Sequence, residues 1–93
     1  MEKWSVAIEA AGDVEMTREQ IVELADAVAE SGGIASGIGQ KHYGATVLIE
    51  AKTRQEAIDR GTSVFRTAAA EAGLPEWPIT TVEAVGESEA GDD

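Results

Sequence analysis

The sequence states one short pattern twice, and this repeat constrains the fold more than any other feature. Residues 5–10 (SVAIEA) are echoed by residues 46–51 (TVLIEA), and residues 17–20 (TREQ) by residues 53–56 (TRQE). In each copy an alternating, strand-like run precedes a Thr-x-x-Gln/Glu segment that is typical of a helix N-terminus. The chain therefore contains two strand–helix units of the same kind.

Apolar periodicity predicts the remaining elements. Helices are expected from Thr17 to Ser31 and from Thr53 to Gly73, where apolar residues recur at helical spacing. A hairpin turn is expected at residues 42–44. Strands are expected over residues 4–11, 34–41, 45–51 and 79–85.

This βαββαβ order predicts an α+β, ferredoxin-like fold. We expect a four-stranded antiparallel sheet of order 4132 with both helices on one face. The strands at residues 4–11 and 45–51 are expected side by side at the centre, running in the same direction, with the other two strands at the edges.

Length and composition indicate one domain, residues 1–86, followed by a disordered acidic tail, residues 87–93. The chain has no cysteine, so thiolate metal sites, disulfides and cysteine nucleophiles are excluded. No stretch has the roughly 20 apolar residues of a membrane span, and the first residues lack the pattern of a signal peptide. We expect a cytoplasmic protein with no cofactor.

The charge balance argues against two classes of partner. Eighteen acidic residues against seven basic ones give a net charge of −11, which repels nucleic acid and anionic membrane surfaces. A halophilic source or a GC-rich genome can also produce this composition, and composition does not separate these origins.

Glu9 and Glu50 occupy equivalent positions in the two repeated strands and point away from the helices. If they are neighbours, they can share a proton as an acid–base couple or recruit a cation or a partner's arginine. The alternative is two solvated glutamates on an open sheet face.

Arg18 and Arg54 follow the two capping threonines, and parallel central strands would bring both helix N-termini to one end of the sheet. Backbone N–H groups and two guanidinium groups can bind a phosphate or a carboxylate there. The alternative is helix capping by the threonines and surface ion pairs for the arginines.

His42 and Tyr43 lie at the expected hairpin turn, where a proton shuttle and a hydrogen-bond donor are chemically possible and plain polar surface is the alternative. Trp77 lies between two prolines, and we expect it to cover a helix end or a sheet edge. One loop, residues 11–16, is longer than its counterpart in the second repeat, where Lys52 alone stands. Drift in loop length and contact with a partner both account for this.

The bare sheet face is expected to expose small and weakly polar residues, among them Ala7, Leu48, Gly37 and Gly39. Sheet-to-sheet or edge pairing would cover such a face. We therefore expect a non-enzymatic homodimeric module that binds a protein partner or a small ligand. The alternative is an enzyme of the dimeric α+β barrel type, in which two sheets enclose a cavity.

The run from Gly73 to Pro78 (GLPEWP), followed by residues 79–85 (ITTVEAV), resembles small actinobacterial domains of the ferredoxin-like type. In some of those proteins a helix-turn-helix segment follows, which implies a third possibility, a stand-alone relative of a transcription-associated domain. The resemblance implies neither an activity nor site residues.

Overall fold

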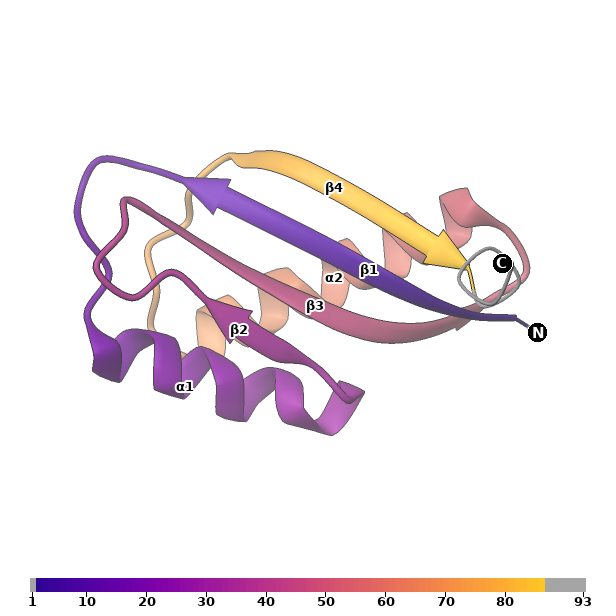
Figure 1. Ribbon diagram of the computed structural model, residues 1–93, viewed down its shortest axis with the longest axis horizontal. Coiled ribbons are helices and arrows are strands. Elements are labelled where there is room, and N and C mark those ends of the chain that lie inside the picture. Colours follow the sequence, from indigo (N-terminus) through magenta and orange to yellow (C-terminus); the bar gives the residue numbers. More distant parts are fainter. Residues whose placement is uncertain (1, 87–93) are drawn as a thin grey trace, which may run out of the picture.

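The computed structural model describes residues 2–86, which form one sheet and two helices (Figure 1). The strands and helices follow the predicted βαββαβ order. In chain order they are β1 (Glu2–Ala11), α1 (Arg18–Val28), a short 3-10 turn (Ala29–Ser31), β2 (Ile34–Ser36), β3 (His42–Ala51), α2 (Arg54–Glu71) and β4 (Ile79–Gly86). The α+β class is confirmed.

The four strands form one antiparallel sheet in the order β2-β3-β1-β4, which is β4-β1-β3-β2 when read from the opposite edge. The central position of β1 and β3 is confirmed. Their expected parallel direction is wrong, since β3 runs antiparallel to β1. The reason is the tight β2–β3 connection: β2 runs parallel to β1 after the α1 crossover, and the hairpin then reverses the chain.

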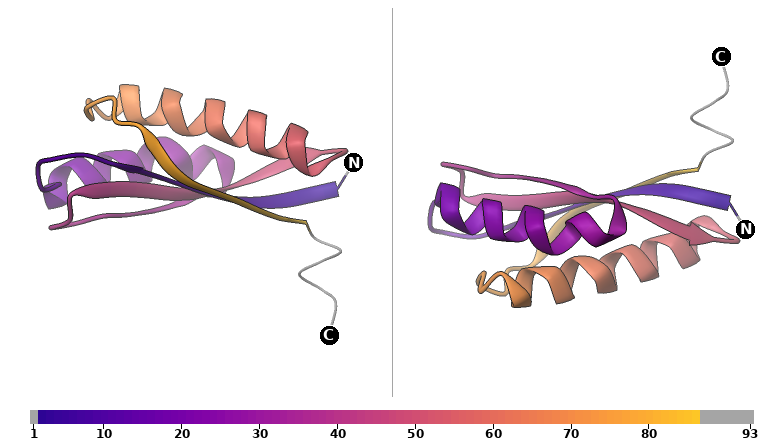
Figure 2. Two further views of the ribbon diagram at one scale, coloured as in Figure 1. Left: turned by 90° about the horizontal axis from the view of Figure 1, so that it is seen from above. Right: turned by 90° about the horizontal axis from the view of Figure 1, so that it is seen from below.

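Both helices lie on the same face of the sheet, and the other face carries no helix (Figure 2). The alternation of β1 explains this arrangement, because Trp4, Val6, Ile8 and Ala10 are buried while the residues between them are partly exposed. The core lies between sheet and helices, and Phe65 of α2 contributes its largest helical side chain.

The two repeated threonines both cap helices. Thr17 accepts a hydrogen bond from the Gln20 N–H at 3.2 Å, and the Gln20 side chain accepts one from the Thr17 N–H at 2.8 Å. Thr53 accepts in the same way from the Glu56 N–H at 3.1 Å, but the Glu56 carboxylate reaches the backbone N–H of Lys52 instead. Each cap contributes about 1 kcal/mol.

The edge strand β2 is shorter than predicted, and the hairpin turn lies at residues 37–41 instead of 42–44. Gly37 and Gly39 have φ of 130° and 74°, which the extended backbone of a strand does not allow. Gly37 is buried, with His42 backbone where a β-carbon would stand, so it does not form part of the exposed sheet face as predicted.

The longer loop of the first repeat is docked on this turn. Met16 is 2% exposed, and its backbone donates to the Gln40 carbonyl and accepts from the Gly39 N–H, each at 2.8 Å. The Gly12 N–H donates to the Lys41 carbonyl at 2.9 Å. The extra residues therefore give the first repeat a backbone connection to the β2–β3 turn.

Two further predictions concern the acidic tail and the absence of a membrane span. The acidic tail, residues 87–93, lies outside the described residues. Within residues 2–86, neither helix combines the length and the apolar character needed to cross a bilayer.

Candidate functional site on the bare sheet face

We define the bare face as the side of the sheet opposite the helices. The register places its residues in rows that cross the strands. One row is Ser36, Gly44, Glu9 and Thr81, from β2 across β3 and β1 to β4. The next rows are Ile34, Thr46, Ala7 and Glu83, then Leu48, Ser5 and Val85, and finally Glu50 and Lys3.

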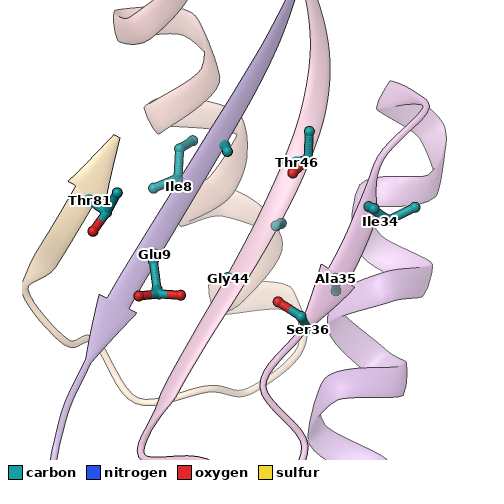
Figure 3. Close-up of a pocket in the computed structure, with 10 residues that line it drawn as sticks. Ile8, Glu9, Ile34, Ala35, Ser36, Gly44, Thr46 and Thr81 are labelled. Atoms are coloured by element: carbon teal, nitrogen blue, oxygen red, sulfur yellow. The ribbon is translucent and has the colours of Figure 1, made fainter. Parts of the chain in front are cut away.

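A shallow hollow of about 170 Å³ lies over the first two of these rows (Figure 3). It exists because the side chains in the middle of the face are small. Gly44 has none, and Ala7 has a single methyl group, so the Glu9 carboxylate and the Ser36 and Thr81 hydroxyl groups stand around a low floor.

Glu9 and His42 are the titratable groups that the structure brings together at this end. The His42 Nδ1 atom is 3.4 Å from a Glu9 carboxylate oxygen, and both side chains are partly exposed, at 37% and 43%. Nδ1 itself is buried and makes no hydrogen bond among the described residues. A ligand that enters along the face can therefore reach the partly exposed Glu9 carboxylate, which accepts hydrogen bonds, but not the buried Nδ1 atom.

Glu9 and Glu50 do not meet. Glu9 pairs with Gly44, whereas Glu50 pairs with Lys3, which lies six residues before Glu9 on β1. At about 3.3 Å per residue the two glutamates are about 20 Å apart. They share the bare face, as expected, but antiparallel strands place them at its opposite ends, so the expected carboxylate pair does not form.

Arg18 and Arg54 are separated for the same reason. The helices α1 and α2 begin at opposite ends of the sheet (Figure 1), so no joint anion site forms from the two N-termini. The Arg54 guanidinium carbon instead lies 5.7 Å from the ring centroid of Trp4. That distance is typical of a cation–π contact.

Tyr43 belongs to the core and not to an exposed turn. It is 2% exposed, and its hydroxyl donates to the Pro75 carbonyl at 2.6 Å. Burial raises the pKa of Tyr43 above its usual value of 10.0. The ring lies between Phe65 and Trp77, so Trp77 covers the end of the core, as the sequence indicates.

Ser36 and Thr81 are the site residues that sequence reasoning misses. Neither belongs to a motif, and only the strand register puts them in the row of Glu9. Glu9 also faces a local irregularity, because β4 shifts register between Glu9 and Ala10 and the Thr80 hydroxyl donates to the Glu9 carbonyl at 3.3 Å.

Within residues 2–86 no three histidine, aspartate or glutamate side chains lie close enough together to form a metal site. No family model matches the chain, and the searches of curated proteins and of solved structures also returned no match. The resemblance of the residue 73–85 segment to actinobacterial domains stays a prediction.

Proposed function

We propose that this domain is a non-enzymatic homodimeric interaction module of the ferredoxin-like type, whose bare sheet face is covered by a second copy. The fold assignment rests on the β1-α1-β2 and β3-α2-β4 units, which interleave so that β1 and β3 take the centre of the sheet. The interface rests on the residues of the bare face.

The observation that carries the proposal is the pair of exposed aliphatic side chains on that face. Ile34 is 70% exposed and Leu48 is 46% exposed, and they occupy adjacent rows on neighbouring strands. Single exposed apolar residues are common, but two in adjacent rows with small neighbours form a surface that association buries favourably.

Charge placement favours a second copy as the occupant. Lys3 and Glu50 lie at one end of the bare face, and Glu9 and His42 at the other. Consider a two-fold axis that lies in the interface and runs perpendicular to the strands. It places one end of the bare face over the opposite end of the second copy's bare face, so Lys3 of one copy meets Glu9 of the other. The same operation places the row of Leu48 over the row of Ile34, with these two aliphatic side chains on neighbouring strands of the facing sheets.

Sedimentation velocity tests the proposal, with two variants of matched exposure. At micromolar concentration the wild-type chain should sediment as a dimer, with twice the chain mass of 9.7 kDa. Leu48→Glu puts a charge in the centre of the interface and should give a monomer. Val22→Glu changes a side chain of nearly equal exposure, 45%, on α1, and should leave the dimer intact.

Salt sharpens this test. Two chains of charge −11 repel each other, so dimerisation should strengthen as salt screens the repulsion. A wild-type chain that stays monomeric at high salt and high protein concentration, or a Leu48→Glu variant that dimerises as well as Val22→Glu, contradicts the proposal.

The Glu9–His42 contact supports a second candidate, an enzyme of the dimeric α+β barrel type. In that arrangement two sheets enclose a cavity, and the Glu9–His42 pair would line it as a proton acceptor and donor. A structure of the dimer separates the two candidates: a cavity of roughly 300 Å³ or more favours the enzyme, and a filled interface favours the module.

A further inference from the structure

The chain turns from the end of α2 toward β4 on the helix side of the sheet (Figure 2). A second hollow is lined by residues of α2 and of this connecting segment, together with Tyr43. Its volume is about 210 Å³, and it is separate from the bare face. An apolar cavity of roughly 150 Å³ accommodates benzene, so this hollow has room for one aromatic ring with a short substituent.

One wall of the hollow is a stack of three aromatic rings. Tyr43 is in the middle, with the ring centroids of Phe65 and Trp77 each 5.6 Å away and interplanar angles of 26° and 29°. The Tyr43 hydroxyl is fixed to the Pro75 carbonyl, and Trp77 packs over Gly12, where a β-carbon would collide with the indole. The wall is therefore held in place before any ligand arrives.

Two alanines of α2 also line the hollow and take up little of its space. Ala69 is buried and Ala70 is exposed, and both line the hollow beside Leu74. A larger side chain at either position would fill the space that lies in front of the aromatic stack. Apolar walls with a few polar groups at the rim are typical of small-molecule sites.

The rim carries a guanidinium group. Arg66 lies 3.9 Å from Glu76, but Glu76 is 90% exposed and Arg66 48% exposed, so this ion pair is weak and a ligand carboxylate can replace it. The planar fork of arginine matches a carboxylate with two parallel hydrogen bonds. The net charge of −11 opposes an anion at long range, where salt screens it, and Glu76, which also lines the hollow, opposes it locally until the ligand carboxylate takes its place on Arg66.

We propose that this hollow binds a small planar aromatic acid, with the ring against Trp77, the accessible member of the stack, and the carboxylate on Arg66. The site goes beyond the proposed dimer function and does not depend on it, because none of its lining residues lies on the bare face. A monomeric Leu48→Glu chain binds the same ligand equally well.

Three matched probes test the site: phenylacetate, 2-phenylethanol and 2-phenylethylamine, which share a ring and differ in charge. Binding is followed by the two indole N–H signals in a nitrogen-15 NMR spectrum of the 93-residue chain. Trp77 lines the hollow, while the Trp4 indole donates to the Ala51 carbonyl at the other end of α2 and serves as internal control.

Phenylacetate should shift the Trp77 signal with a Kd of about 1 mM, as expected for a ligand of this size, and leave the Trp4 signal in place. The alcohol should bind about fivefold more weakly, and the amine more weakly still. Equal or tighter binding of the amine, equal shifts of both indoles, or no shift with phenylacetate overturns the proposal.

Variants of exposed residues complete the test without risk to the fold. Arg66→Gln should weaken phenylacetate about fivefold and leave 2-phenylethanol unchanged. Ala70→Leu should fill the hollow and abolish binding of all three probes, whereas Thr67→Leu, an exposed position on the same helix outside the lining, should not. Full affinity in Ala70→Leu excludes this hollow as the site.

Discussion

The two faces of the sheet use neighbouring residues of the same strands for different purposes. On the covered face Val6, Ile8 and Val47 are 0% to 2% exposed, and each such side chain contributes roughly 1.5–3 kcal/mol by burial. On the bare face the residue next to each of these is smaller or more exposed, as Ala7 and Leu48 are.

Under the proposed function, folding and recognition are divided between the two faces. The covered face supplies the free energy of folding, because its side chains fill the space under α1 and α2. The bare face contributes little to folding, so its residues are open to contacts with a second chain. Substitutions that compare equivalent residues on the two faces measure this division directly.

The largest expected difference is between two isoleucines. Ile8→Ala, on the covered face, should lower the free energy of unfolding by about 3 kcal/mol, because it leaves a cavity in the core. Ile34→Ala, on the bare face, should change it by no more than about 0.5 kcal/mol in the monomer. Urea unfolding of both variants measures the contrast.

Protein concentration extends this comparison to the dimer. If the chain dimerises as proposed, Ile34→Ala should become destabilising above the dimerisation concentration, since the second copy would then bury Ile34. A large cost of Ile34→Ala in the monomer would show that the bare face is part of the folding core, and the division between the faces would be wrong.

A smaller effect is expected on the covered side at Tyr43, the chain's single tyrosine. Tyr43→Phe removes the hydroxyl that donates to Pro75 and leaves its carbonyl without this partner, so it should cost about 1 kcal/mol. Urea unfolding at neutral pH gives this value.

The same residue makes a prediction for alkaline pH. Burial raises the pKa of Tyr43, so as pH rises past about 10 the unfolded chain loses this proton before the folded chain does. The wild-type protein should therefore lose stability above that pH more steeply than Tyr43→Phe. Parallel pH profiles of the two proteins would contradict the raised pKa.

Sequence patterns predict the parts of this fold that depend on local chemistry. The alternation around Val6 and the capping threonines Thr17 and Thr53 place β1 and both helices correctly. The predicted parallel direction of β3 and β1 is wrong. The repeat shows that the two strands are alike, but it does not show how the chain between them turns.

The candidate site was less predictable than the fold for the same reason. Sequence equivalence predicts that Glu9 and Glu50 are neighbours. The antiparallel register instead places them at opposite ends of the bare face. Gly37 alternates like a strand residue, yet its positive φ makes it part of the turn. The row that joins Ser36 to Thr81 crosses four strands, and no local pattern encodes it.

The smallest expected effect tests the geometry of the bare face itself. Double-mutant cycles with Glu9→Gln should give a coupling of up to about 0.5 kcal/mol with His42→Gln at a pH where histidine is protonated, because a partly exposed ion pair at 3.4 Å attracts only weakly. The cycle with Glu50→Gln should give none beyond the error of about 0.3 kcal/mol, since the two carboxylates are about 20 Å apart. Both cycles are measured by urea unfolding below the dimerisation concentration, so that a second copy does not bring the ends of the face together. If Glu9 couples to Glu50 as strongly as to His42, the register that separates the two glutamates is wrong, and the division of charge that favours a two-fold dimer fails with it.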